Sequence, residues 1–171
     1  RSGQRLSFAE LGVTRARSGL AWGATFAALV VLAAVAAVSV GQVRTQVKLS
    51  APSEFSSQLW LFAAFVSVPL ATVLFEELFF RGVLWAYLSR IFSPVRVLLV
   101  SSVFFALWHV PPLLVSGEAA GGQFPLLAQV LLTVVVTFAG GLVFGFLRLR
   151  SGSLVAPVVA HVATNSVGFI V

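Results

Sequence analysis

FEELFFRGVLW, the stretch from Phe75 to Trp85, sets two adjacent glutamates and an arginine among large apolar side chains. The chain of 171 residues contains only five acidic residues, and two of them are Glu76 and Glu77. An ionised side chain in the middle of a membrane helix costs about 2.5–3.5 kcal/mol on insertion scales. Unpaired, these two glutamates and Arg81 would together cost on the order of 8–10 kcal/mol, which rivals the ~5–15 kcal/mol stability of a whole domain. The stretch therefore predicts a helix whose charges are paired and face protein or a water-filled cavity.

The composition of the chain is that of a polytopic membrane protein. Hydrophobic residues make up 59% of the chain, charged residues only 9%, and the mean hydropathy is +1.04, whereas a soluble domain has roughly 25% charged residues. The net charge is +6, but the basic residues fall between apolar runs, where they orient membrane spans, so we expect no nucleic-acid partner. The chain has no cysteine, which excludes disulfides, a cysteine nucleophile and cysteine-ligated zinc. It does not begin with Met, as expected of a processed form or a fragment.

Five apolar runs predict an all-α fold, a transmembrane helix bundle of about five spans. The runs cover residues 20–40, 59–88, 97–115, 124–147 and 154–171. A helix over 20–40 would be roughly 31 Å long, close to the ~30 Å hydrocarbon core of a bilayer. Pro111 and Pro112 are expected to break or kink the third run near its end.

The charges between the runs predict the orientation and the division of the chain. Arginines precede the first run and follow the second and the fourth, whereas the loop after the third run has no lysine or arginine. The positive-inside rule then places the N-terminus in the cytoplasm; the loop with Arg44 and Lys48 is the weak point of this assignment. We expect a cytoplasmic basic or interfacial segment over 1–18, a first transmembrane helix and loop over 19–56, and the remaining helices over 57–171. Within the first segment, Gln4–Arg17 is expected to be an amphipathic helix on the inner membrane surface or a flexible basic tail.

Helical spacing predicts different roles for the two glutamates. Glu77 and Arg81 are four residues apart, on one helix face, and can form an ion pair. Glu76 points about 100° away from that face, so Arg81 can neutralise Glu77 and leave Glu76 free for other chemistry. A purely structural ion pair is the alternative, and it accounts for Glu77 and Arg81 but not for Glu76.

Both histidines of the chain lie within apolar runs, at a depth similar to that of Glu76. Counted along each helix from the nearest loop arginine at about 1.5 Å per residue, Glu76 lies ~21 Å deep, His109 ~20 Å and His161 ~16 Å. Asn165 follows His161 by one helical turn. The titratable groups of three helices are therefore expected to converge near the middle of the membrane.

One carboxylate, two imidazoles and one carboxamide suit hydrolysis. A carboxylate and an imidazole can hold a water molecule and remove its proton. A second imidazole and an asparagine amide can donate to the oxyanion of a tetrahedral intermediate. The alternative is zinc ligated by Glu76, His109 and His161, since a glutamate with two histidines is a catalytic zinc ligand set with an open fourth position. However, the sequence has no HExxH motif, and the three candidate ligands lie on three separate helices.

Three short motifs follow one another along the chain. They are EExxxR at Glu76, Glu77 and Arg81, FxxxH at Phe105 and His109, and HxxxN at His161 and Asn165. In this order and spacing they resemble the motifs of the CPBP family, the CAAX proteases and bacteriocin-processing enzymes that are also called the Abi family. The stretch GLVFGFLRLRSGSLVAPVVAHVATN also resembles that family's glycine-rich helix, G-S-L turn and following helix. The resemblance runs from about Leu59 to Val167, and no motif position departs from it.

The resemblance implies an intramembrane endopeptidase of the kind that trims prenylated CAAX proteins in eukaryotes, with residues 57–171 as its protease core. It implies that Glu76 and His109 activate the water, His161 and Asn165 form the oxyanion hole, Glu77 and Arg81 shape and stabilise the site, and Phe105 packs beside it. We favour a metal-free glutamate protease without a cofactor, and zinc held by Glu76, His109 and His161 remains the alternative.

The expected partners are the lipid bilayer, a membrane-associated peptide or protein substrate and, through residues 1–56, another membrane protein. The expected location is a bacterial plasma membrane, with the N-terminus cytoplasmic. Two other functions stay open. The same fold could act as a non-catalytic scaffold, an immunity factor or a partner subunit, and intramembrane Glu and His residues also mark proton pathways of transporters.

Overall fold

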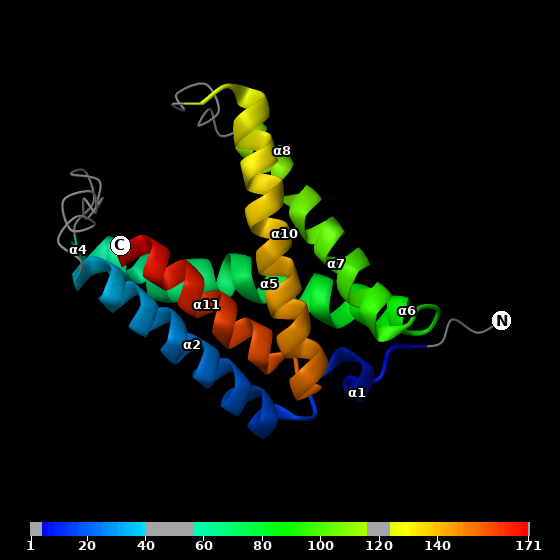
Figure 1. Ribbon diagram of the computed structural model, residues 1–171. Coiled ribbons are helices and arrows are strands. Elements are labelled where there is room, and N and C mark those ends of the chain that lie inside the picture. The colour runs from blue at the N-terminus through cyan, green and yellow to red at the C-terminus, as the bar shows by residue number, and fades with distance from the viewer. Residues whose placement is uncertain (1–4, 40–56, 116–123, 171) are drawn as a thin grey trace.

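The protein is a bundle of long helices, seen here in a computed structural model that describes residues 5–39, 57–115 and 124–170 (Figure 1). Within these ranges it contains no strand. Four stretches are helical, long and apolar enough to cross a membrane, and a fifth apolar helix is shorter: Phe8–Ala37, Ala63–Ser89, Pro94–Val115 and Leu126–Ser151, with Val155–Val167 as the shorter one. The predicted all-α bundle of about five spans is confirmed.

Most of the helices are regular α-helices, and their bounds follow the apolar runs closely. They are α1 Phe8–Leu11, α2 Ala16–Ser39, α4 Ser57–Phe62, α5 Leu74–Glu77, α6 Trp85–Ser89, α7 Pro94–Trp108, α8 Val110–Val115, α10 Leu126–Ser151 and α11 Val155–Ile170. As expected from Pro111 and Pro112, the third span is interrupted near its end: α7 stops at Trp108, His109 caps it, and α8 follows.

The second span is a continuous rod, residues 57–89, that alternates between α-helical and π-helical turns. Its π-helical parts are η1 Ala63–Ser67, η2 Pro69–Val73 and η3 Leu78–Leu84. The second of them begins at Pro69, which has no N–H to donate to an α-helical ladder. Turns of this kind are rare and occur frequently at functional sites, and here they flank the two glutamates of α5.

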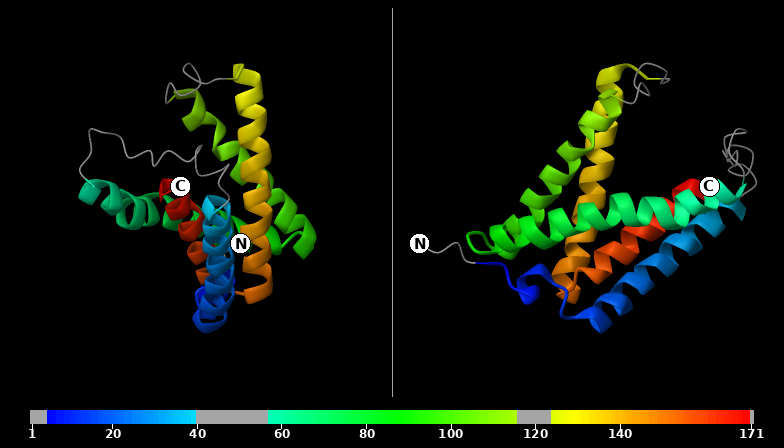
Figure 2. Two further views of the ribbon diagram at one scale, coloured as in Figure 1. Left: turned by 60° about the vertical axis from the view of Figure 1, so that its left-hand side comes forward. Right: turned by 180° about the vertical axis from the view of Figure 1, so that it is seen from behind.

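The helices form two diverging groups (Figures 1 and 2). The rod lies beside α11, and α2 packs lengthwise along α11. α7 and α10 form the second group, and they pack against each other at Gly141, where an added Cβ would lie only 3.0 Å from the Cα of Ser102. A core of mostly aromatic and small residues joins the two groups: Phe80, Phe105, Phe144, Leu147, Ala156 and Ala160.

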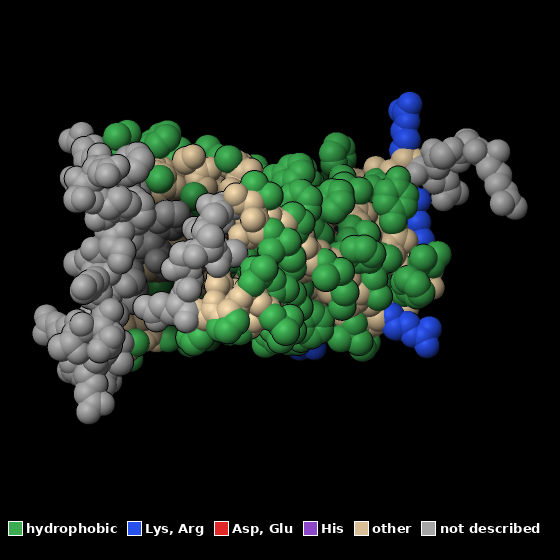
Figure 3. All heavy atoms as spheres, turned by 90° about the horizontal axis from the view of Figure 1, so that it is seen from above, with side chains coloured by type: hydrophobic (Ala, Val, Ile, Leu, Met, Phe, Trp, Pro, Cys, Tyr) green, Lys and Arg blue, Asp and Glu red, His purple; other side chains and the backbone are tan. Residues whose placement is uncertain are grey.

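The ends of several elements meet where the two groups of helices converge. α1, the α6–α7 turn and the α10–α11 turn all lie there. In Figure 3 the arginine side chains of the described residues gather mainly at one end of the molecule, next to a band of apolar side chains. This separation of charge from the apolar band is the one that membrane orientation by positive charge requires.

Of the two alternatives for Gln4–Arg17, the prediction of a single amphipathic helix is wrong for the described part of that range. α1 ends at Leu11, and Gly12 caps it in the left-handed conformation, with φ 81° and ψ 21°. α2 then begins at Ala16. Glycine commonly ends a helix in this way, because it adopts a positive φ without steric cost.

Candidate active site

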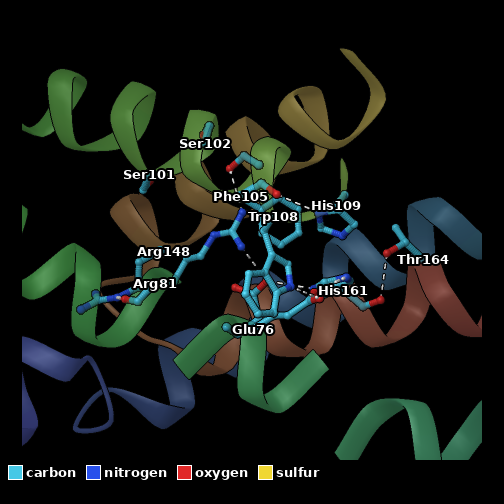
Figure 4. A network of polar contacts seen from close by, with 12 residues as sticks. Glu76, Arg81, Ser101, Ser102, Phe105, Trp108, His109, Arg148, His161 and Thr164 are labelled. Carbon is cyan, nitrogen blue, oxygen red and sulfur yellow. Dashed lines mark hydrogen bonds and ion pairs between the residues drawn. The ribbon is translucent and has the colours of Figure 1, made fainter. Parts of the chain in front are cut away.

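A group of charged side chains is enclosed in the middle of the bundle (Figure 4). Glu76 and Glu77 come from α5, Arg81 from η3 and His161 from α11. Their side chains belong to residues that are 5%, 0%, 0% and 5% exposed, in that order. Charged residues are rarely buried unless they are paired, so the contacts of each decide what it can do.

Glu77 and Arg81 form the predicted ion pair. Arg81 Nη1 lies 3.1 Å from Glu77 Oε1, and Nη2 donates to the carbonyl oxygen of Gly141 at 3.3 Å. The guanidinium carbon also lies 4.0 Å from the centre of the Phe105 ring, within the range of a cation–π contact. Arg81 therefore connects the rod to α10 through Gly141 and to α7 through Phe105.

His161 contacts both glutamates, one with each ring nitrogen. Its Nδ1 lies 2.9 Å from Glu77 Oε1, and its Nε2 lies 3.9 Å from Glu76 Oε2. An ionised carboxylate can only accept a hydrogen bond, so Nδ1 carries the proton of this bond. Glu77 therefore fixes the orientation of the ring, and Nε2 is the nitrogen that faces Glu76.

Glu76 is buried beside this pair without an arginine of its own. Among the described residues its Oε1 accepts a hydrogen bond from Trp108 Nε1 at 3.3 Å, and no ion pair joins it to Arg81. An offset of about 100° on the helix would suggest that the Glu76 carboxylate points away from the ion pair. It nevertheless lies near the pair, because the His161 ring reaches Glu77 with one nitrogen and Glu76 with the other. Glu76 is thus the less neutralised carboxylate of the cluster.

His109 lies at the edge of the cluster and is half-buried. Its Nδ1 is 2.7 Å from the carbonyl oxygen of Phe105. Since a carbonyl oxygen only accepts, Nδ1 is the donor and Nε2 of the neutral ring is left as an acceptor. The Phe105 ring lies 4.6 Å from the His109 ring and 5.8 Å from the His161 ring, centre to centre, so it packs against both histidines.

The structure brings some of the predicted site residues together more closely than others. Glu76, Glu77, Arg81, Phe105 and His161 form one contiguous cluster, which His109 joins through Phe105. Within the part of the chain that the structure describes, no hydrogen bond or ion pair links His109 to Glu76. Asn165, one turn after His161 on α11, is half-buried, and its side chain makes no hydrogen bond to a described residue.

Two residues of the site were not predicted from the sequence. Trp108 donates to Glu76, and Phe144 stacks on the His161 ring at 4.5 Å between ring centres and an interplanar angle of 23°. Trp108 directly precedes His109, which is a weak signal, because adjacent helical positions face different directions. Phe144 had no signal apart from its place on an apolar helix.

The three candidate zinc ligands do not form a ligand set as they lie. In residues 5–39, 57–115 and 124–170, no group of three or more His, Cys, Asp or Glu side chains is placed to bind one metal ion. His161 Nδ1 is bonded to Glu77, and His109 Nδ1 is bonded to a backbone carbonyl. Both bonds leave Nε2 of the ring free, and metal-ligating histidines commonly donate their other N–H in this way, so zinc held by Glu76, His109 and His161 stays the alternative.

The cluster is also not a fully satisfied structural ion pair. Among the described residues, Glu77 Oε2 and Arg81 Nε are buried without a hydrogen-bond partner. Most buried polar atoms in native proteins are paired, and unpaired ones are expected chiefly where function requires them.

The family comparison covers this whole site. The model of the Rce1-like family, described as type II CAAX prenyl endopeptidases, matches residues 58–167. Comparisons with curated proteins and with solved structures gave no match. The matched region is well over half of the chain and contains all three motifs. The chain therefore belongs to the Rce1-like family of type II CAAX prenyl endopeptidases, a family of CAAX-type intramembrane proteases.

Proposed function

We propose that this chain is an active intramembrane endopeptidase that hydrolyses a peptide bond with a water molecule activated by Glu76 and His109. The observation that carries the proposal is the position of Glu76. It is a buried carboxylate that forms no ion pair with an arginine among the described residues, and it lies 3.9 Å from a histidine whose other nitrogen contacts a second carboxylate.

In the first step, Glu76 is the general base. The water oxygen attacks the peptide carbonyl carbon, a C–O bond forms, and a water proton moves to the Glu76 carboxylate. The acceptor nitrogen Nε2 of His109 holds the same water, since Nδ1 is committed to the Phe105 carbonyl. A correctly placed general base contributes about 10²–10⁴-fold to the rate.

His161 and Asn165 stabilise the oxyanion that forms in this step. His161 donates from Nε2 when that nitrogen is protonated, and its ring is already oriented by Glu77 and by stacking on Phe144. The Asn165 carboxamide is available to a substrate, because it makes no hydrogen bond within the described residues. Donors fixed before the reaction are the ones that stabilise a developing charge most effectively.

In the second step, the intermediate collapses. The C–N bond breaks, protonated Glu76 gives its proton to the leaving nitrogen, and the products are a carboxylic acid and an amine. Glu76 returns to its ionised form. Glu77, Arg81 and Phe105 do not exchange protons here; they hold the His161 ring and the helix that carries Glu76.

The proposed substrate is a membrane-associated peptide or protein. Three residues of the site or next to it are more accessible than the buried glutamates: His109 and Asn165 are half-buried, and Trp108 is 45% exposed. The surroundings of the site are apolar side chains on lipid-length helices, so a substrate reaches it from the bilayer. The arginines at one end of the molecule support a plasma-membrane location with the N-terminus cytoplasmic.

The proposal is tested by incubating the detergent-purified protein with peptide and membrane-anchored substrate libraries, with and without a strong chelator. A Glu76→Gln preparation, purified in parallel, controls for contaminating proteases. Cleavage by the wild type that survives the chelator and is lost in Glu76→Gln is the expected result. Cleavage lost with chelator and restored by zinc would contradict the metal-free mechanism, and repeated failure of the wild type would favour a scaffold.

A further inference from the structure

A second buried arginine, Arg148, contacts the backbone of the helix that carries the site. It belongs to the last turn of α10 and is only 6% exposed. Its Nε donates to the backbone carbonyl of Arg81 at 3.1 Å, and its Nη2 donates to the backbone carbonyl of Glu10 at 2.9 Å. One guanidinium therefore joins the rod to the segment before α2, and no proton transfer of the proposed reaction uses it.

The carbonyl that Arg148 contacts lies where the helical pattern changes. Arg81 lies in the π-helical segment η3, in which each backbone hydrogen bond spans five residues. The α-helical pattern returns at Trp85, where α6 begins. A side chain that bonds to the backbone of a helix is one of the recognised causes of a local irregularity in that helix. The side chain of the same Arg81 is bonded to Glu77 and to the Gly141 carbonyl, so Arg81 is held at both its backbone and its guanidinium.

The segment on the other side of Arg148 is itself ordered. Glu10 closes a capping box with Ser7 at the start of α1, and its carboxylate pairs with Arg90 at 2.8 Å. The carbonyl of Gly12 accepts a hydrogen bond from the backbone N–H of Leu154 at 2.8 Å. This segment, residues 7–12, is thereby fixed to α6 and to the start of α11.

Gly12 favours this contact in two ways. Its φ of +81° is a conformation that glycine adopts without steric cost, and an added Cβ would lie 2.5 Å from Cζ of Arg148. The guanidinium thus lies directly against the backbone of the turn. Residues 7–12 are outside the region that the family model matches, so this link is a feature that the three motifs do not describe.

We propose that Arg148 is a positioning residue for the site: it links the segment 7–12 to the Arg81 backbone and so sets the position of the turn that carries Glu76, Glu77 and Arg81. This inference rests on the proposed function. A shift of about 1 Å in a catalytic group can reduce a rate by about 100-fold. Loss of the link should therefore lower kcat and leave substrate binding nearly unchanged.

The test compares Arg148→Gln and Arg148→Lys with the control Arg150→Gln. Lysine keeps the charge but lacks the planar fork that donates in two directions. Arg150 is exposed on the same helix turn and contacts Trp22 rather than the site. We expect kcat to fall by about 10- to 100-fold in both Arg148 variants, with KM within about twofold, and no such loss in Arg150→Gln.

A second readout does not need activity. The indole signal of Trp108 in a spectrum of protein labelled with ¹⁵N-tryptophan reports on the site, because Trp108 donates to Glu76. We expect this signal to move in both Arg148 variants and to stay in Arg150→Gln, in which the Trp22 signal moves instead.

The two readouts separate the two proposals. An inactive wild type in which the Arg148 variants still move the Trp108 signal would overturn the proposed function and support the link. An active protein in which both Arg148 variants keep the wild-type kcat and the wild-type Trp108 signal would overturn the link alone.

Discussion

At the scale of single residues, two adjacent glutamates have different surroundings. Glu77 is fully buried and contacts Arg81 and His161 through one oxygen. Glu76 has only an indole donor and the more distant nitrogen of the same histidine. The ion pair was predictable from i,i+4 spacing. The Glu77–His161 and Glu76–Trp108 contacts were not, because sequence gives the depth of a residue in a membrane but not the direction in which its helix face points.

This difference predicts that two isosteric substitutions lower the stability of the protein by very different amounts. Glu77→Gln leaves Arg81 as a buried charge without its partner, and breaking a buried ion pair in this way costs about 3–5 kcal/mol. Glu76→Gln removes a carboxylate that pairs with no arginine, so its cost should be much smaller. Thermal unfolding in detergent should show a large drop in Tm for Glu77→Gln only; equal drops for the two variants would contradict the division of roles.

Trp108 should affect the rate through its hydrogen bond to Glu76. Trp108→Phe keeps an aromatic ring against Phe75 and Phe80 but removes the donor. A single hydrogen bond contributes about 1 kcal/mol, so we expect kcat to change by roughly fivefold, at 1.4 kcal/mol per factor of ten. The control is Trp22→Phe, because Trp22 packs on Phe146. An equal change of kcat in both variants would contradict a specific effect of Trp108 on Glu76.

At the scale of helices, hydropathy predicted the spans well and their internal geometry poorly. The fifth run was expected over 154–171, and α11 is Val155–Ile170. The break near Pro111 and Pro112 was also predicted, because a proline inside a helix removes a backbone hydrogen bond and clashes with the preceding turn. The π-helical turns of the rod were not predicted, since hydropathy does not distinguish an α-helix from a π-helix.

The contact between α7 and α10 should be sensitive to a single methyl group. A Cβ at Gly141 would lie 3.0 Å from the Cα of Ser102, a backbone atom that cannot move aside, whereas a Cβ at Gly140 would meet nothing closer than 3.9 Å. Overpacking typically costs about 1–3 kcal/mol. We therefore expect Gly141→Ala to lower both Tm and kcat, because α7 carries Phe105 and leads into His109.

Gly140→Ala, the neighbouring substitution, is the matched control and should leave both quantities close to those of the wild type. If Gly141→Ala behaved like Gly140→Ala in both measurements, the close approach of α7 and α10 would not be needed to build the site.

At the scale of the whole molecule, the arrangement joins a charged end to an apolar band. The arginine-rich end was predicted from the loops, and the described arginine side chains lie mainly at one end of the molecule (Figure 3). The divergence of the two helix groups and the contact of α2 with α11 could not be predicted, because sequence periodicity does not say which helices are neighbours. The described residues before 57, in α1 and α2, therefore pack onto the core that carries the site.

The orientation can be measured directly, since the chain has no cysteine and each engineered variant would carry a single thiol. Ser93, exposed in the α6–α7 turn, lies at the arginine-rich end, and Val115 is 85% exposed at the end of α8. In sealed vesicles, an impermeant thiol reagent should label Ser93→Cys from the cytoplasmic side and Val115→Cys from the other side. Reversed labelling would show that the N-terminus is not cytoplasmic.

The central claim is that Glu76, in this buried cluster, carries out peptide hydrolysis. The most direct measurement is the single-turnover rate of cleavage by Glu76→Gln relative to wild type, at equal concentrations of folded protein in liposomes. The account predicts that the folded variant retains its Tm and loses at least about 100-fold in rate. A rate within about threefold of the wild type, well outside the loss expected for a general base, would contradict it.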